Sequence, residues 1–455
     1  MDRGLERLIL WSCCVCHDFY GRGRALDRNP TWTSTWTWTW TWTWTPTRPP
    51  SAIRCSSRPG QLHPPVRLLA MHLSEDEIYR SSTQYRLWSF TPDKLQSLRR
   101  STNAAAAERV KANINRFRNT KADGNGADHL DPLTPEEELK LVVMYCKKCT
   151  ELGNFLKFPS RVIAAAIQYV KRFYLFNSAM AYDPKKIMPS CLFLATKTEV
   201  NFISSATFAS KLPNKTAEDI LAPEYLIIQA LRFTLEVRHP HRGLDGANLE
   251  LMDMAKGQAV LLPGSSKSAQ EIQADMMRLQ SEPNGVPTNG DEASLLSRVK
   301  AAWGTARETL KTVATFTDVY FFYTPSQIWL AALFLADEPL ALFYVDTKFP
   351  LANGAANPAI FDLKHKVVAT VRACAEMLQA GHVEESREEI GRIARKRDAC
   401  SDPEKADLIG LHAAQKRGGA LEGKVDEKAA KRRKLEREQS QQQAEEFWGP
   451  ELKKE

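Results

Sequence analysis

An internal repeat is the feature of this sequence that most limits what the chain can fold into. The segment YDPKKIMPSCLFLATKTE at residues 182–199 returns as YTPSQIWLAALFLADEPL at residues 323–340, with seven identical positions at a constant offset of 141 residues. Each copy has a proline near its start and then an apolar run, which is typical of the first turn and the centre of a buried helix. Each copy also follows a long helical pattern and precedes a shorter and a longer one. The sequence therefore predicts an all-α protein with two five-helix repeats, each wrapped around its apolar third helix.

Helix-start signals divide the chain around this repeat. Thr134, followed by Pro135 and three glutamates, predicts the start of the first repeat, because a hydroxyl cap and acidic side chains stabilise the first turn of a helix. One continuous helix is expected over about residues 216–235, and another over 295–323. The last helix of the second repeat is expected at residues 358–380.

Composition divides the chain into five parts. Residues 1–70 form an arginine-rich, low-complexity leader in which threonine and tryptophan alternate from Thr35 to Thr45, and the compositional break places the expected functional start at Met71. Further helices are expected to flank the two repeats on both sides. The parts after the leader are an N-terminal helical segment and loop at 71–133, the first repeat at 134–238, the second repeat at 239–380 with an insertion at about 257–292, and a charged C-terminal tail without a clear core at 381–455.

The net charge of +8 belongs mostly to the leader, which carries nine arginines and four acidic residues. The remaining 385 residues have a net charge of only +3. A DNA-binding core needs a strongly basic surface to neutralise phosphates, so this balance favours a protein-binding regulator over a nucleic-acid binder. No apolar run reaches the roughly 18–20 residues of a membrane helix, so we expect no membrane contact.

The cysteine pattern predicts neither a metal site nor another cofactor. Cys146 and Cys149 have the spacing of a zinc-ligand pair, but no second pair follows at the required distance, so we expect both on a helix face. A denser cluster of three cysteines and a histidine, at residues 13–17, lies in the leader. The sequence also has no phosphate-cradling glycine loop and no nucleophile elbow, so an enzyme is not predicted.

Two further polar patterns have modest interpretations. His239 and His241 flank Pro240 without a partnered acid nearby, which favours surface or capping roles over catalysis. The basic cluster KAAKRRK at residues 428–434 is compatible with nuclear import and equally with the solvated face of a helix.

The two copies of the repeat agree in their cores and differ directly after the shared LFLA. The first copy continues as TKTE at residues 196–199, whereas the second continues as DEP at residues 337–339. A charged residue at a helix end is usually a solvated terminus. A repeat with one functional copy should nevertheless differ at its contact surface, so we expect Lys197 to contact a partner.

Four strings in this sequence resemble the cyclin family. They are SSTQYRLWSFTPDKLQSLR at 81–99, RVIAAAIQYVKRFYLFNSAMAYDPKKIMPSCLFLATKTE at 161–199, LRFTLEVRHPHRGLDG at 231–246 and DVYFFYTPSQI at 318–328. The resemblance covers roughly residues 74–380, and the leader and the insertion depart from it. It implies two cyclin boxes and a regulatory subunit that binds and activates a cyclin-dependent kinase.

The resemblance also implies a kinase-binding site. In cyclins, a lysine at the end of the third helix of the first box and a glutamate in its fifth helix contact the αC helix of the kinase and its flanking loop. The matching positions are Lys197 and Glu224, and nearby apolar positions of the same groove match Leu194, Ile228 and Leu235. Because Glu224, Ile228 and Leu235 are spaced 4 and 7 residues apart, we expect them to share one helix face. The apolar residues should carry the affinity, and the charges should set the register.

The strings are characteristic of the cyclin in the CDK-activating kinase of transcription factor IIH. They imply a nuclear protein whose kinase partner phosphorylates the C-terminal domain of RNA polymerase II. A RING-finger assembly factor and the rest of transcription factor IIH are the other implied partners, with no direct nucleic-acid binding. The alternatives are another transcriptional cyclin or a DNA-binding factor of the same fold, like the core of transcription factor IIB. The latter should have a zinc ribbon before its repeats.

Overall fold

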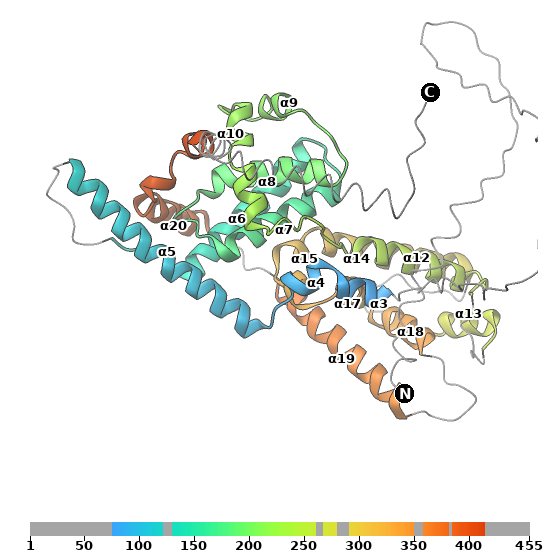
Figure 1. Ribbon diagram of the computed structural model, residues 1–455. Coiled ribbons are helices and arrows are strands. Elements are labelled where there is room, and N and C mark those ends of the chain that lie inside the picture. The colour runs from blue at the N-terminus through green and yellow to red at the C-terminus, as the bar shows by residue number, and fades with distance from the viewer. Residues whose placement is uncertain are drawn as a thin grey trace, which may run out of the picture.

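The computed structural model describes residues 75–121, 130–260, 267–279, 291–349, 358–381 and 385–414. Within these ranges the regular structure is helical, with no strand, as the sequence predicts (Figure 1). The leader, the basic cluster at 428–434, and the stretches 261–266 and 280–290 of the insertion lie outside the described residues.

The first repeat packs around a buried central helix. Its helices are α6 (Pro135–Phe155), α7 (Ser160–Phe176), α8 (Pro184–Thr198), α9 (Ser205–Ala209), α10 (Ala217–Leu221) and α11 (Glu224–Ala230). α8 begins where the Asp183 carboxylate accepts a hydrogen bond from the Lys185 amide, with Pro184 in the first turn. Ile187 and Leu192 of α8 are fully buried. α8 packs against α6 and α7, so the third helix forms the apolar centre as predicted.

The second repeat is built in the same way around α17 (Pro325–Ala336). Its other helices are α12 (His241–Ala255), α14 (Glu292–Lys311), α15 (Val313–Phe316), α16 (Val319–Phe322), α18 (Glu338–Lys348) and α19 (Pro358–Ala380). Thr324 caps α17 by accepting a hydrogen bond from the Gln327 amide. α17 packs against α12, α14 and α19, and α13 (Ala269–Met277) of the insertion packs against α12.

The continuous helix expected over residues 216–235 is wrong. α10 ends before Pro223, whose ring cannot continue a helix, and α11 starts directly after it. The chain then leaves α11 at Leu231, because Arg232 and Phe233 both have positive φ values, of 53° and 57°. Residues 232–238 therefore form a non-helical linker to the second repeat.

The continuous helix expected over residues 295–323 is also wrong. α14 ends at Lys311, and two short helices, α15 and α16, follow it. The break lies at Thr312, whose φ of −100° and ψ of −82° are not helical, and beyond it the Thr315 and Thr317 hydroxyls donate to backbone carbonyl oxygens of the preceding turn. Such local bonds compete with regular helix pairing.

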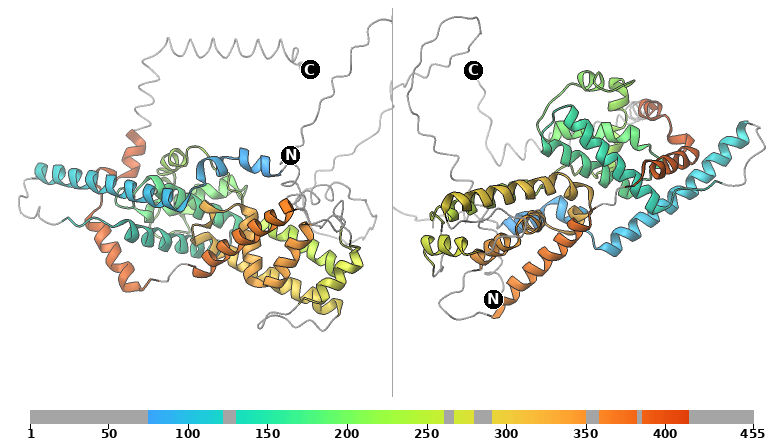
Figure 2. Two further views of the ribbon diagram at one scale, coloured as in Figure 1. Left: turned by 90° about the horizontal axis from the view of Figure 1, so that it is seen from below. Right: turned by 180° about the vertical axis from the view of Figure 1, so that it is seen from behind.

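Helices outside the repeats pack onto them at both ends. α3 (Glu75–Ser81), α4 (Thr83–Trp88) and α5 (Pro92–Lys121) precede the first repeat, and α20 (Arg387–Ala399) and the 3₁₀ turn η2 (Pro403–Lys405) follow the second. α20 packs against α6, and η2 packs against α5 (Figure 2). Ile393 and Cys400 are buried there, so the expectation of a tail without a core is wrong for this segment. Despite its many charged residues, this segment has a face that packs against the first repeat.

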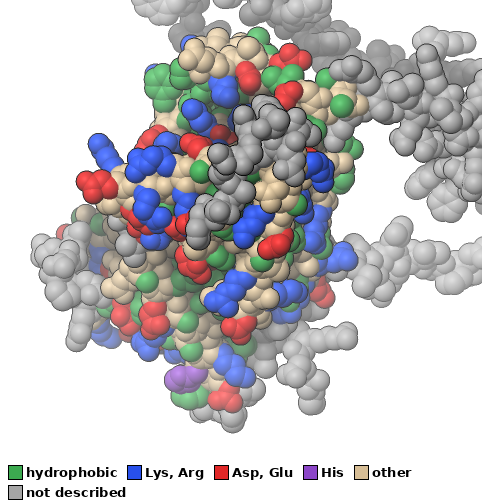
Figure 3. All heavy atoms as spheres, turned by 90° about the vertical axis from the view of Figure 1, so that its left-hand side faces the viewer, with side chains coloured by type: hydrophobic (Ala, Val, Ile, Leu, Met, Phe, Trp, Pro, Cys, Tyr) green, Lys and Arg blue, Asp and Glu red, His purple; other side chains and the backbone are tan. Residues whose placement is uncertain are grey.

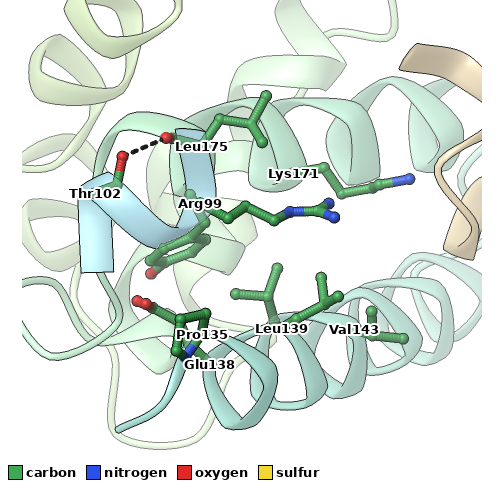
Figure 4. A pocket seen from close by; sticks show the side chains of 10 residues that line it. Arg99, Thr102, Pro135, Glu138, Leu139, Val143, Lys171 and Leu175 are labelled. Atoms are coloured by element: carbon green, nitrogen blue, oxygen red, sulfur yellow. Dashed lines mark hydrogen bonds between the residues drawn. The ribbon is translucent and has the colours of Figure 1, made fainter. Parts of the chain in front are cut away.

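Two cations, one on the first repeat and one on α5, contact the second repeat. Lys171 of α7 donates to the carbonyl oxygens of Thr315 and Thr317 in the second repeat. Arg99 of α5 binds the Asp318 carboxylate through two hydrogen bonds of 2.7 and 2.8 Å, and the Lys171 amine lies 3.8 Å from the same carboxylate. Figure 4 shows Arg99 and Lys171 extending in the same direction along the pocket between α5, α6 and α7. The junction is therefore held by polar contacts as well as by apolar packing.

The surface of the α5 side carries charges of both signs. Figure 3 shows lysine and arginine side chains interspersed with aspartate and glutamate on this face, without a continuous basic field. This mixed pattern agrees with the low net charge that the sequence assigns to the chain after the leader. Among the described helices, none combines the length and the apolar character needed to cross a membrane.

Candidate functional site

The structure brings Lys197 and Glu224 together. The Lys197 amine at the end of α8 lies 2.5 Å from a carboxylate oxygen of Glu224 at the start of α11. The same amine lies 4.5 Å from the centre of the Phe193 ring, one turn back along α8. The Lys197 side chain remains 39% exposed and that of Glu224 17% exposed. The pair is thus ordered by the chain itself and still open to a partner.

Local backbone structure explains why both charges stand at helix ends. α8 ends after Thr198, and Val200 has a φ of 56°, which turns the chain so that the Asn201 amide donates to the Thr196 carbonyl. Pro223 forces the start of α11, so Glu224 occupies its first turn, where the partial positive charge of the helix N-terminus favours a carboxylate.

A second ion pair borders the first. The Arg161 guanidinium at the start of α7 lies 2.5 Å from the carboxylate of Glu199. Partial burial raises the pKa of Glu199, and the charge of Arg161 opposes this rise. The end of α8 therefore contributes to two ion pairs: Lys197 supplies the positive charge of one, and Glu199 supplies the negative charge of the other.

The three expected apolar contact residues lie in different environments. Leu194 is only 3% exposed and belongs to the core beneath the surface, whereas Ile228 of α11 is half-buried. Leu235 lies in the linker after α11, so the expectation that Glu224, Ile228 and Leu235 share one helix face is wrong. The left-handed turn at the end of α11 is the physical reason, because it separates Leu235 from the helix axis.

Exposed apolar side chains near the pair were missed by sequence reasoning. Val200 and Phe202 follow α8 and are 72% and 77% exposed; Tyr225 and Phe233 lie at the two ends of α11 and are 47% and 66% exposed. Val200 and Phe202 alternate with polar residues directly after a predicted helix end, which is a signal that could have identified them. Large exposed side chains around an ordered charged pair are typical of a protein-binding surface.

The second repeat carries a charge-reversed counterpart of the pair. Glu338 occupies the repeat position of Lys197, and its carboxylate lies 3.2 Å from the guanidinium of Arg372 on α19. Arg372 in turn lies 5.8 Å from the ring of Phe334, which is the repeat partner of Phe193. Each repeat therefore carries an ion pair at the end of its third helix, and the charge at the matching positions 197 and 338 is reversed.

The cysteine pair of α6 has no features of a metal site. Cys146 and Cys149 lie on α6 and are fully buried, and burial raises the pKa of Cys146 to about 12, so its thiol stays protonated. No group of three or more histidine, cysteine, aspartate or glutamate side chains among the described residues could hold a metal ion.

The histidines beside Pro240 are less exposed than their sequence context suggested. His241 is the first residue of α12, which fits the expected position near a helix start. The Nδ1 atom of His239 lies 3.3 Å from the Tyr320 hydroxyl, and its Nε2 atom is buried. His239 is therefore a packing residue at the junction of the repeats.

Comparison with known proteins identifies the family. The family pattern described as Cyclin, N-terminal domain matches residues 135–236, and that of the Cyclin C-terminal domain matches residues 239–379. The chain belongs to the cyclin family. Lys197 and Glu224 lie in the N-terminal cyclin domain, and the charge-reversed pair lies in the C-terminal one.

Individual cyclins and one solved structure are similar to this chain over much of its length. This cyclin is 34% identical over 290 residues to Cyclin CCL1 of Saccharomyces cerevisiae, in an alignment that covers 62% of this chain and 64% of that protein, just under two thirds of its length. It is 31% identical over 271 residues to Cyclin mcs2 of Schizosaccharomyces pombe, covering 59% of this chain and 73% of that protein. Among solved structures, it matches a chain in the CAK complex of Chaetomium thermophilum bound to ATP-γ-S, with 34% identity, a TM-score of 0.59, and coverage of 76% of this chain and 96% of that chain.

Proposed function

We propose that this cyclin is the cyclin H-type regulatory subunit of a CDK-activating kinase. It binds and activates the cyclin-dependent kinase of transcription factor IIH and so supports phosphorylation of the RNA polymerase II C-terminal domain. A RING-finger assembly factor and the remainder of transcription factor IIH are its further partners, and it acts in the nucleus. The likeness to a chain of the CAK complex supports this proposal.

The observation that carries the proposal is the ordered pair of Lys197 and Glu224 amid exposed apolar side chains. A protein kinase is active only when its β3 lysine pairs with the glutamate of αC, and the position of αC controls that pairing. A surface that binds αC in its inward position shifts the equilibrium toward the active kinase by its differential affinity for that state.

Apolar and charged residues divide this task. Phe202, Tyr225 and Phe233 expose large surfaces whose burial against the kinase supplies affinity. Lys197 and Glu224 select the register, because charges at an interface contribute more to specificity than to net binding energy. Leu194 and Ile228 pack beneath this surface, and Leu235 packs beside it from the linker.

The experiment is co-purification of the kinase with variants of the full chain. The double variant Lys197→Ala/Glu224→Ala should lower the affinity for the kinase about tenfold, measured as recovered kinase and kinase activity. The matched control is Glu338→Ala/Arg372→Ala, which removes the equivalent pair of the second repeat and should leave recovery unchanged. Normal recovery of active kinase by the first double variant would overturn the assigned surface.

A further inference from the structure

One buried hydroxyl joins three parts of this cyclin. Tyr169 of α7 is fully buried, and its hydroxyl donates to the Leu235 carbonyl oxygen at 2.6 Å. The same hydroxyl lies 2.9 Å from the hydroxyl of Thr198, the last residue of α8. Because the Leu235 carbonyl can only accept, the tyrosine proton lies on that bond, and the single proton of the Thr198 hydroxyl is shared between the tyrosine oxygen and the Ala195 carbonyl oxygen at 3.2 Å. The bridge therefore connects α7, the end of α8 and the linker between the two cyclin boxes.

The linker at one end of this bridge is held firmly by side chains. The Gln84 amide of α4 accepts from the Arg238 backbone amide at 2.7 Å and donates to the Arg238 carbonyl at 3.4 Å. The Trp88 indole donates to the Thr234 hydroxyl at 2.9 Å. Arg172 of α7 donates to the linker as well, at the carbonyl of residue 236. The linker is thus held in place, so the hydrogen bond between Tyr169 and the linker can fix a second segment relative to it.

The other end of the bridge is the last turn of α8. Backbone bonds close this turn, because the amides of Val200 and Asn201 donate to the carbonyl groups of Lys197 and Thr196, and the Tyr169 bond to Thr198 connects the closed turn to the linker. Thr198 directly follows Lys197, so any movement of this turn moves the lysine. Burial raises the pKa of Tyr169 to about 12, against smaller opposing effects of Thr198 and Arg172, so the bridging hydroxyl keeps its proton at physiological pH.

We propose that Tyr169 is a positioning residue for kinase activation, which fixes the end of α8, and with it Lys197, against the linker between the boxes. This inference rests on the proposed function. A surface that is ordered before binding loses less conformational freedom when the partner docks, so removal of the bridge weakens the kinase complex without touching the kinase.

The test is activation of the purified kinase by increasing concentrations of the full chain. Tyr169→Phe keeps the ring and removes only the hydroxyl. It should shift the concentration for half-maximal activation upward by about three- to tenfold, a change of the size expected for one hydrogen bond, and leave the activity at saturation unchanged. Thr198→Val breaks the same bridge from the other side and should produce the same shift.

The chain offers a matched control on the same helix. The hydroxyl of buried Tyr174 also donates to a backbone carbonyl, that of Tyr182, at 2.9 Å, but this bond does not involve the end of α8. Tyr174→Phe should lower the melting temperature about as much as Tyr169→Phe and leave the half-maximal concentration unchanged. Equal shifts for both variants would overturn the positioning role and indicate general destabilisation.

A second arm tests whether Tyr169 acts through Lys197. In a chain that already carries Lys197→Ala, the substitution Tyr169→Phe should cause little further shift, because residues that act through one contact are not additive. A full additional shift would overturn the proposal. If the unsubstituted chain does not activate the kinase, the proposed function itself fails and the positioning role fails with it. If it activates and Tyr169→Phe behaves like Tyr174→Phe, only the positioning role fails.

Discussion

At the scale of single residues, burial separates the side chains that shape the site from those that can touch a partner. Leu194 and Phe202 are both apolar and lie close together in sequence, yet Leu194 is 3% exposed and Phe202 is 77% exposed. Exposure of this kind depends on where α8 ends, which the apolar pattern alone does not reveal. The two residues therefore have distinguishable roles.

Substitution of each by alanine should separate stability from binding. Leu194→Ala leaves a cavity in the core and should lower the free energy of unfolding by about 2–4 kcal/mol. Phe202→Ala should change that free energy by less than about 0.5 kcal/mol but weaken kinase binding about tenfold or more. Chemical denaturation and kinase titration measure the two effects, and a loss of stability for Phe202→Ala would contradict its assignment as a contact residue.

His239 should make stability depend on pH. Burial, then the neighbouring charges of His241 and Arg172, lowers its pKa to about 3, against about 6.5 in an unfolded chain. The stability that neutral His239 contributes is therefore fully present above pH ~6.5 and is lost as the pH falls toward 3. Between pH 7.5 and 5.5 this single group should cost about 1 kcal/mol of unfolding free energy.

His239→Gln should remove this part of the pH dependence. Denaturation curves at pH 7.5 and 5.5 should differ by about 1 kcal/mol less in the variant than in the unsubstituted chain. His365→Gln, at an exposed position of α19, serves as the control and should leave the difference unchanged. An unaltered pH dependence in His239→Gln would show that the imidazole is not held neutral by the fold.

At the scale of helices, the strongest sequence signals are local ones. Asp183 with Pro184, and Thr134 with Pro135, mark helix starts that the structure confirms, because capping and the fixed φ of proline act within one turn. The repeat of α8 as α17 is equally readable from sequence. Lys197 and Glu224 could be named in advance from the family resemblance, and the structure brings them together as a pair.

The features that the sequence did not reveal depend on contacts between distant segments. α11 ends in a left-handed turn made by Arg232 and Phe233, and neither is the glycine that usually signals such an end. Backbone carbonyl groups that follow the break after α14 accept hydrogen bonds from the buried amine of Lys171, which lies far away in sequence. α20 docks onto α6 through Glu137, which binds Lys396 at 2.9 Å, an ion pair that composition alone counts as solvated charge.

The polar junction between the boxes yields a prediction about helix packing. Asp318 is the shared counter-charge for Arg99 and buried Lys171. Burial lowers the pKa of Lys171, and Asp318 opposes this, so removal of the carboxylate leaves a buried amine without its nearest counter-charge. Asp318→Asn should lower the free energy of unfolding by about 2–3 kcal/mol.

An exposed ion pair provides the control for this substitution. Asp346 lies 2.6 Å from Lys364, with both side chains more than a third exposed. Asp346→Asn should therefore cost at most about 0.5–1 kcal/mol, as is usual for a surface pair. Urea denaturation compares the two variants, and equal losses would contradict the view that the junction is held by the buried charges.

At the scale of the whole molecule, the protein consists of two copies of one helical unit. The surface ion pairs of the two copies have opposite charges at matching positions. The cores of α8 and α17 agree, whereas Lys197 with Glu224 is matched by Glu338 with Arg372. The surface around α5 mixes both signs of charge (Figure 3). Under the proposed function, we expect recognition of the kinase to depend on the direction of one ion pair and on the apolar side chains beside it, so that the second box does not substitute for the first.

Exchange of the two charges tests this claim most directly. Lys197→Glu/Glu224→Lys keeps an ion pair within the chain but presents the kinase with the reversed polarity, and its unfavourable charges at the two helix ends should cost about 1 kcal/mol of stability. Half-maximal kinase activation should then require at least about tenfold more cyclin, with only a small decrease in the melting temperature. The matched exchange Glu338→Arg/Arg372→Glu should leave activation unaltered. Unchanged activation by the first exchange, or equal loss in both, would contradict the account.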